Sequence, residues 1–367
     1  MVEERELTRD IRMFVSIVSI LILFGLMFIY SSSSIFALER YGNAAYFLHR
    51  QLVYLGVGVV GFALFRLIPL EWLKRRASYL FLGAMGVTAL TLVPFFALRV
   101  HGSNRWFSLM GVSFQPSEFL KLMLFIYLGL IFSRKQNRLK SFTATYLPCL
   151  MVLGAVSLLL LLQPDFGSVV TIFCTAFAMF FVAEFNYRHL LVTALLALPA
   201  ALFLIFTKSY RLQRILVFLD PWSDPQGRGF QIIQSLIAIG SGGLWGLGVG
   251  QSKQKFFYLP MQHTDFRFSI VAEEIGFAGS FLLVTMFLAL CFYGFRVVTR
   301  LQDSFAFFTS MAFVVFITLQ AVINFMVALG LLPTKGLGLP FVSYGGTALI
   351  AYCCMVGLMV NFTKNNN

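Results

Sequence analysis

Charged residues are scarce in this sequence, and that scarcity decides the class of protein. They make up 12% of the 367 residues, whereas hydrophobic residues make up 59% and the mean hydropathy is +0.84. A soluble domain carries about 25% charged residues, and half that share cannot cover the surface of a water-soluble protein of this size. The composition therefore excludes a soluble enzyme, a secreted disulfide scaffold and a disordered chain, and it predicts a membrane protein.

Metal-binding and disulfide motifs are lacking as well. No CxxC pair or Cys/His cluster occurs, the four histidines are scattered, and the five cysteines lie inside apolar runs. We therefore expect neither a zinc site nor a disulfide framework, and no metal site is predicted from the protein's own residues. The net charge of +13 is read as a signal of loop orientation in a membrane rather than of nucleic-acid binding.

Long apolar runs are what the sequence has in abundance. A bilayer core of about 30 Å needs about 20 mostly apolar residues in a helix. The sequence predicts one all-α, polytopic membrane domain over residues 1–367 with about ten transmembrane helices. The ten runs are 13–30, 52–69, 77–98, 119–132, 146–162, 166–183, 190–206, 268–295, 305–332 and 341–360.

The distribution of Lys and Arg predicts the orientation. With a cytoplasmic N-terminus, fifteen of these residues fall in inside segments and five in the short outside loops. Short loops obey the positive-inside rule, so both termini are expected in the cytoplasm. A long extracytoplasmic loop, about 207–265, then separates the seventh and eighth helices, and its length predicts a functional segment.

Two features of this external segment have open interpretations. Arg211 and Arg214 share one face of a helix, where they either snorkel to lipid phosphates or bind a phosphate of the substrate. The stretch 240–250 is rich in glycine but is neither a Walker A loop nor a GxGxxG fingerprint. Its glycines allow close approach either to another helix or to a ligand, with equal weight.

Carboxylates at the mouth of the eighth run need a reason to be there. Asp265, Glu273 and Glu274 are costly near a membrane unless they are paired, protonated or engaged in chemistry. A helix N-terminus accounts for Asp265 through the macrodipole. It does not account for Glu273 and Glu274, which lie too deep in the run.

Opposite charges also stand in separate apolar runs. Lys121 and Asp165 are expected to pair, and Glu118, three residues before Lys121, would complete the network. A structural ion pair and a catalytic role are equally compatible with this pattern. Further on, prolines and glycines in 332–346 predict a broken re-entrant connection, which indicates a cavity on the outer face.

Together these motifs resemble the SEDS family (shape, elongation, division and sporulation), bacterial membrane proteins that polymerise peptidoglycan glycan strands. The similarity covers nearly the whole chain. Residues 41–48 and 333–336 are more similar to the cell-division members than to the elongation members. The most specific motifs are Arg105-Trp106, Gln115-Pro116-Ser117-Glu118 with Lys121, Gln163-Pro164-Asp165-Phe166-Gly167, Asp220-Pro221-Trp222, Gly229-Phe230-Gln231, His263-Thr264-Asp265-Phe266, Glu273-Glu274-Ile275-Gly276 and 339–346.

Three positions depart from the family's pattern. Met261 stands where a Glu is usual, Arg267 where an aliphatic residue is usual, and Thr347-Ala348 where a serine pair is common. The first two flank the expected catalytic site without removing it. They put the detail of the substrate site in doubt more than the activity.

The resemblance implies a glycosyltransferase that polymerises lipid II, a disaccharide-pentapeptide on undecaprenyl pyrophosphate, with inversion. Asp265 matches the position of the general base. The leaving pyrophosphate needs cationic stabilisation, for which Arg211, Arg214 and Lys253 are candidates, and a divalent cation (Mg²⁺ or Mn²⁺) is expected as a helper without a visible ligand set. The remaining substrate-binding candidates are His263, Glu274 and Ser343.

The resemblance also implies a setting and partners. The protein is expected in the cytoplasmic (inner) membrane at the division septum, with a class B penicillin-binding transpeptidase and other divisome proteins, and without nucleic acid. The alternatives are a lipid II flippase, a noncatalytic scaffold and an elongation polymerase. Polar motifs concentrated on the external side favour the polymerase over a flippase, which needs a polar route from both leaflets.

Overall fold

The fold is a bundle of long helices, as the apolar runs predict. The structure is a computed structural model that describes residues 2–93, 98–100, 103–109, 112–254, 266–334 and 336–364. Each of the ten predicted runs coincides with a helix. These are α1 (Val2–Tyr41), α2 (Tyr46–Leu67), α3 (Leu70–Leu90), α4 (Pro116–Arg134), α5 (Leu147–Leu162), α6 (Phe166–Val182), α7 (Tyr187–Phe206), α10 (Arg267–Val298), α11 (Ser304–Ala328) and α12 (Gly346–Lys364).

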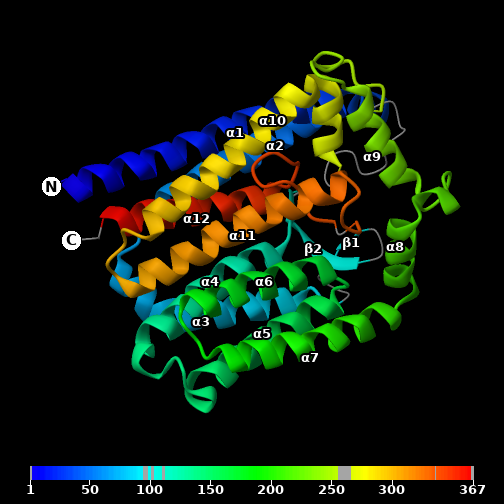
Figure 1. The fold of residues 1–367 in the computed structure, drawn as a ribbon. Helices are drawn as coiled ribbons and strands as arrows, with labels where there is room; N and C mark the ends of the chain where they lie inside the picture. Colours follow the sequence, from blue (N-terminus) through cyan, green and yellow to red (C-terminus); the bar gives the residue numbers. More distant parts are fainter. Residues whose placement is uncertain are drawn as a thin grey trace.

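Eight helices of the described chain are long and apolar enough to cross a membrane. The two predicted spans outside this group are α3, whose first turns carry charged residues, and α6, which has 17 residues. Both run alongside the other helices of the bundle (Figure 1). The chain is therefore a multi-pass membrane protein.

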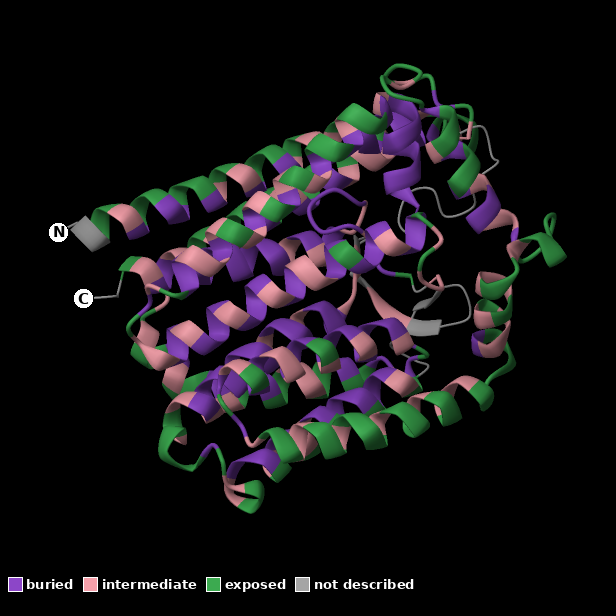
Figure 2. Ribbon diagram, viewed as in Figure 1, coloured by how far each residue is buried: buried purple, intermediate pink, exposed green. Residues whose placement is uncertain are grey.

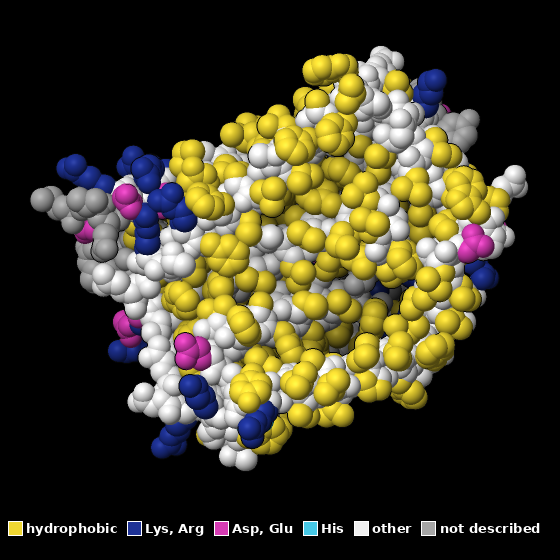
Figure 3. All heavy atoms as spheres, viewed as in Figure 1, with side chains coloured by type: hydrophobic (Ala, Val, Ile, Leu, Met, Phe, Trp, Pro, Cys, Tyr) yellow, Lys and Arg dark blue, Asp and Glu magenta, His cyan; other side chains and the backbone are white. Residues whose placement is uncertain are grey.

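The two ends of the bundle differ in what they carry. Both termini lie at one end, while β1, β2, α8 (Ser209–Leu219) and α9 (Phe230–Ser241) lie at the other (Figure 1). In the space-filling view, Lys and Arg side chains gather around the end with the termini, and hydrophobic side chains cover the middle (Figure 3). This arrangement agrees with an even number of crossings and with the predicted orientation signal.

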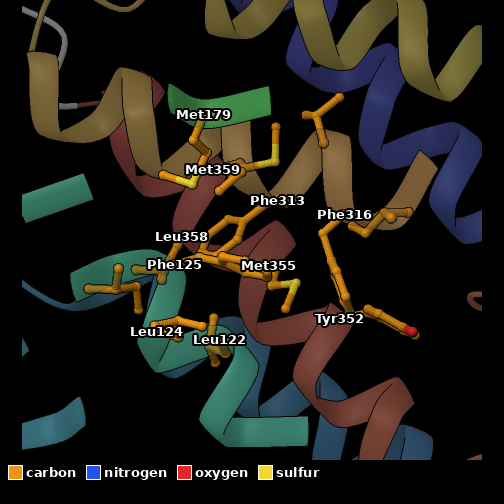
Figure 4. Close-up of a cluster of buried hydrophobic side chains, with 14 of the residues drawn as sticks. Leu122, Leu124, Phe125, Met179, Phe313, Phe316, Tyr352, Met355, Leu358 and Met359 are labelled. Atoms are coloured by element: carbon orange, nitrogen blue, oxygen red, sulfur yellow. The ribbon is translucent and has the colours of Figure 1, made fainter. Parts of the chain in front are cut away.

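The core of the bundle is formed by helices that are apolar all round. Most residues of α12, α4 and α11 are buried, as expected for helices without a polar face. Figure 4 shows Phe125 of α4 among Phe313 and Phe316 of α11 and Met355 of α12. Of the five cysteines in the apolar runs, Cys149, Cys353 and Cys354 are buried, whereas Cys174 is exposed and Cys291 is half-buried.

Helices α2 and α12 pack closely through small residues. A Cβ atom on Gly61 would lie 2.9 Å from the Sγ atom of Cys354, and one on Gly357 would lie 2.5 Å from the carbonyl oxygen of Phe62. Small residues at such positions let two membrane helices approach backbone to backbone. The short side chains thus determine how α12 seats in the bundle.

One helix is an exception to this close packing. α7 contributes no buried residue and lies along the edge of the bundle, exposed over most of its length (Figure 2). A space-filling view shows the surface hollowed between α7, α8 and the rest of the bundle, with Lys or Arg atoms visible inside (Figure 3).

The end of the bundle opposite the termini, which the predicted orientation makes external and which is therefore called the external end, contains more regular structure than the sequence predicted. The third run was expected to continue to residue 98, but α3 ends at Leu90 and Leu98–Val100 is strand β1. It pairs with β2 (Ser103–Leu109), which pairs with β3 (Val112–Phe114), all antiparallel. The segment expected as a long loop includes α8, the 3-10 turn Pro221–Ser223 and α9.

Candidate functional site

The candidate site is built around a break in α10 at the external end. Gly276 has φ 67° and ψ −167°, a conformation open to glycine, and it interrupts the helix. The amides of Leu247 and Gly248 donate to the carbonyls of Glu273 and Glu274, both at 3.0 Å. The glycine-rich segment thus satisfies carbonyls that the break leaves without helical partners.

The same segment accepts hydrogen bonds from the other side of the break. The amide of Phe277 donates to the Gly243 carbonyl at 2.8 Å, and the amide of Ala278 to the Leu244 carbonyl at 3.0 Å. Residues 243–248 and the two halves of α10 therefore form one hydrogen-bonded unit. Irregular backbone at membrane depth is stable when it is paired in this way.

The structure decides between the two readings of the stretch 240–250 at two of its glycines, and a glycine of α10 faces them. A Cβ atom on Gly242 would lie 2.1 Å from the Ala272 carbonyl oxygen, and one on Gly246 would lie 2.2 Å from that of Glu274. A Cβ on Gly276 would lie 2.2 Å from the Gly246 amide nitrogen. Gly242 and Gly246 on one side and Gly276 on the other thus allow close backbone packing between the stretch and α10.

Replacing Gly246 by alanine is expected to disrupt this unit. The new methyl would collide with backbone at a residue whose φ is +81°. Gly240→Ala is the matched control, because a Cβ there meets nothing within 4 Å and the residue lies in α9. We expect Gly246→Ala to lower Tm and abolish polymerisation, while Gly240→Ala raises stability by about 0.5–1 kcal/mol. Equal melting temperatures of the two variants in detergent would contradict the packing role.

Glu273 and Glu274 are adjacent, but they bind different parts of the chain. Glu273 accepts hydrogen bonds from the Ser252 hydroxyl, from the Lys253 amide at 2.9 Å and from the Gln254 amide at 3.4 Å. Glu274 accepts from the hydroxyl of Ser31 in α1, at 2.6 and 2.7 Å to its two oxygens. Both carboxylates are buried and their cost is offset by these donors.

The predicted base and its neighbour in the motif lie outside the described residues. These are Asp265 and His263, so their side chains receive no structural account. The described chain resumes at Phe266, which is buried against Ile270, Ile323, Val327 and Leu337. Asp265 is therefore bonded directly to a residue seated in the protein interior at the external end of α10.

Arg267, which departs from the family's pattern, is fully buried beside this position. It is the first residue of α10 and the largest side chain in the protein interior with almost no exposure. The sequence alone did not show that the guanidinium two residues after the predicted base is buried.

The two external arginines of α8 differ in accessibility. Arg211 is buried, with Nη1 donating to the Leu204 carbonyl at 2.8 Å and its guanidinium 5.3 Å from the ring of Phe166. Arg214 donates to the Thr334 carbonyl at 3.2 Å in a more exposed position. Its contact joins α8 to the segment that precedes α12. Lys253 has an exposed side chain, while its amide is held by Glu273.

The predicted pair of Lys121 and Asp165 is wrong. Lys121 Nζ instead lies 2.7 Å from Glu118 Oε1, within α4, so the expected contribution of Glu118 is present. Asp165 Oδ1 lies 3.7 Å from Arg105 Nη1 of β2. Asp165 also begins α6, where it accepts from the Ser168 amide and hydroxyl. Lys121 thus pairs with a glutamate one turn away in its own helix, and Asp165 pairs with an arginine of the unpredicted strand β2. No ion pair joins Lys121 to Asp165 in the described structure.

Arg105 also holds the turn between α5 and α6. Its Nε donates to the Gln163 carbonyl at 2.6 Å and its Nη2 to the Pro164 carbonyl at 2.5 Å. One guanidinium therefore binds three successive residues of the Gln163-Pro164-Asp165 motif. The small sheet and this turn form one unit at the external end.

The segment between α11 and α12 is irregular, as predicted, and it is satisfied by protein groups. Side-chain amides of Gln320 and Asn324 donate to the carbonyls of Gly338 and Leu337, at 3.1 and 2.8 Å. Ser343 accepts from the Leu339 amide at 2.8 Å, so its hydroxyl closes a turn. Its predicted role in binding substrate stays a prediction.

Within the described part of the chain, no group of three or more His, Cys, Asp or Glu side chains could hold a metal ion. The two external carboxylates of α10 are already occupied by hydroxyl and amide donors. The expected divalent cation therefore finds no ligand set among these residues.

Three interactions at the site were missed from the sequence. Ser31 belongs to the run Ser31–Ser34 at the end of the first apolar stretch, and this polar run was a usable signal. Arg105 belongs to the motif Arg105-Trp106, which marked the residue without identifying its partner, whereas Ser252 had no signal, because tertiary structure brings Glu273 to it.

The chain is similar to several known proteins over nearly its full length. A model of the cell cycle protein family that includes FtsW, RodA and SpoVE matches residues 11–367. A probable peptidoglycan glycosyltransferase FtsW of Geobacter sp. (strain M18) is 41% identical, covering 93% of each chain. Stage V sporulation protein E of Bacillus subtilis is 37% identical, covering 95% of this chain and 96% of the relative.

Solved structures share the fold. A chain of a peptidoglycan synthase complex that coordinates polymerization and crosslinking superposes with a TM-score of 0.79 at 31% identity, covering 96% and 97% of the two chains. The rod shape determining protein RodA of Thermus thermophilus superposes with a TM-score of 0.70 at 28% identity, covering 96% of each. This chain therefore belongs to the FtsW/RodA/SpoVE family of cell cycle proteins, the SEDS family expected from its motifs.

Proposed function

We propose that this chain is a peptidoglycan glycosyltransferase that polymerises lipid II into glycan strands at the outer face of the cytoplasmic membrane, for septal wall synthesis. The names of its FtsW relatives support the activity and the role in division. The observation that carries the proposal is the hydrogen-bonded unit at the external end, where the broken α10 begins two residues after Asp265.

Asp265 acts as the general base of the reaction. It takes the proton of a GlcNAc 4-hydroxyl as the oxygen attacks the MurNAc anomeric carbon. The bond from that carbon to the lipid pyrophosphate breaks, and the anomeric centre inverts because a single displacement occurs. The pyrophosphate carries away the negative charge, so cationic groups must stabilise it as it leaves.

Arg214 is the better placed of the two α8 arginines for the pyrophosphate. Arg211 is buried and donates to the α7 backbone, whereas Arg214 is exposed enough to exchange its Thr334 contact for a phosphate. The hollow between α7, α8 and the bundle lies on a face rich in hydrophobic side chains (Figure 3), and we propose that a lipid-linked substrate enters there. His263 and Ser343 remain proposed contacts to the sugar-peptide part. Glu274, the third candidate, is buried with both oxygens bonded to Ser31, so we propose that it serves the packing of α10 instead.

Arg214→Ala is expected to raise KM for lipid II about tenfold or more, because a charge-assisted hydrogen bond to phosphate is lost. Arg228→Ala is the matched control, an exposed arginine of the same external segment. The measurement is the initial rate of polymerisation against lipid II concentration. An unchanged KM in Arg214→Ala would remove this arginine from the substrate site.

The test of the activity is direct. The purified protein with its class B transpeptidase partner is incubated with labelled lipid II, and the product is separated on a gel. A ladder of glycan strands supports the proposal, and recovery of lipid II alone contradicts it.

The proposal also includes other divisome proteins as partners and a cytoplasmic location for both termini. A divalent cation remains a proposal for the leaving group, and we derive no step through it.

A further inference from the structure

We infer that Glu273 is a positioning residue, whose carboxylate fixes the Ser252–Gln254 end of the chain segment that carries Asp265. The inference rests on the proposed function, because only there is Asp265 the base. Glu273 then differs in role from its neighbour Glu274, which binds Ser31 of α1.

The contacts of Glu273 all come from one short segment. Its Oε1 accepts from the Lys253 amide at 2.9 Å, and its Oε2 accepts from the Ser252 hydroxyl and the Gln254 amide. Ser252 and Glu273 are 0% and 1% exposed. A charged acceptor strengthens each of these bonds, so the segment is held more firmly than by backbone pairing.

The anchor and the point where the chain resumes belong to the same half of α10. After Gln254 the described chain continues at Phe266, which is seated among apolar side chains one residue after Asp265. Both flanks of 255–265 are therefore attached to the short outer half of α10, one through Glu273 and the other through the helix itself. Residues 243–248 add a third attachment to the same half-helix.

Glu273 is poorly suited to proton transfer. Its carboxylate is buried, and both of its oxygens already accept hydrogen bonds from the protein. Glu274 binds Ser31 of α1 in the same way, which fixes the half-helix to the bundle. Glu274 thus attaches the outer half of α10 to α1, and Glu273 attaches the external segment to that half-helix.

The experiment compares Glu273→Gln with Glu273→Ala, in the full-length protein with its partner. Hydrogen exchange of a peptide covering Ser252–Gln254 reports the anchor, and lipid II kinetics report its consequence. In Glu273→Ala the Lys253 and Gln254 amides should exchange about tenfold faster, and kcat should fall about 100-fold with KM within twofold, since a displaced base costs turnover rather than binding. Glu273→Gln keeps an acceptor oxygen and should recover kcat to within about tenfold of wild type.

Two further variants keep the test sharp if Glu273→Ala does not fold. Ser252→Ala removes one donor and should show an intermediate loss of kcat with intermediate exchange. Ser241→Ala is the matched control, because its hydroxyl bonds only to the Ala238 carbonyl of its own helix, and it should match wild type.

Two results would overturn the inference. One is a Glu273→Gln variant as inactive as Glu273→Ala with a shifted pH–rate profile, which indicates proton transfer by Glu273. The other is unchanged exchange of residues 252–254 in Glu273→Ala. Activity retained in Asp265→Asn would refute the proposed base, while the exchange measurement would still test the anchor.

Discussion

Asp265→Asn is expected to abolish glycan strand synthesis while the protein still folds and inserts. A general base contributes about 10²–10⁴-fold to rate, and an amide of the same shape cannot accept the hydroxyl proton. The measurement is polymer formed from labelled lipid II by purified Asp265→Asn protein with its partner. Polymer at the wild-type rate would rule out Asp265 as the base.

The control for this experiment separates catalysis from folding and binding. Asp224→Asn is a matched substitution in the same external segment, where the carboxylate accepts from the Arg228 amide. It should retain polymerase activity within about threefold, because a surface interaction of this kind contributes about 0–1 kcal/mol. Loss of activity in Asp224→Asn as well would show that the external segment tolerates no lost carboxylate.

A second readout concerns substrate binding. Lipid II should still bind Asp265→Asn, since the arginine contacts to pyrophosphate do not depend on the base. A loss of binding equal to the loss of turnover would place Asp265 in ground-state recognition instead.

Membrane architecture was accessible from the sequence because it depends on a local property. About 20 apolar residues predict a spanning helix wherever they occur, and all ten predicted runs are helical. Helix ends were less accessible. The third run was predicted to continue to residue 98, but α3 ends at Leu90 and Leu98 already belongs to β1, since a short apolar stretch suits a strand as well as a helix.

Pairing of charges was the least accessible property. The sequence shows that Lys121 and Asp165 each need a partner, but it does not show which helix end or strand brings one. Arg105 reaches Asp165 only because the unpredicted sheet lies over the turn between α5 and α6. Glu118 was identified correctly because an i, i+3 spacing is local.

The glycine-rich stretch illustrates an intermediate case. Composition showed that close approach was required, and only tertiary structure showed that α10 is the neighbour of Gly242 and Gly246. The break at Gly276 could not be predicted for the same reason. The helix is interrupted where residues 243–248 hydrogen-bond to it, and the sequence of α10 does not show that this segment is its neighbour.

Lys121→Met is expected to be the most destabilising substitution in the bundle. Lys121 is 1% exposed and its partner Glu118 is buried, so removing the cation leaves a carboxylate unpaired in the interior. That cost is about 3–5 kcal/mol, which corresponds to a loss of about 5–10 °C in Tm. The ammonium also lies 5.3 Å from the ring of Phe316, a contact that methionine does not replace. Thermal unfolding in detergent, with size-exclusion chromatography for the yield of folded protein, measures the effect.

The pair assignment is tested by two double variants. Glu118→Gln with Lys121→Met should be less damaging than Lys121→Met alone, because no unpaired charge remains. Lys121→Met with Asp165→Asn should be additive within about 0.5 kcal/mol, because Asp165 belongs to Arg105. A strong coupling of Lys121 to Asp165 and none to Glu118 would reverse the assignment. The two ion pairs stabilise different elements, α4 in the first case and the α5–α6 turn in the second. Asp165→Asn should therefore lower polymerase activity, because it loosens the external unit, while the bundle stays folded.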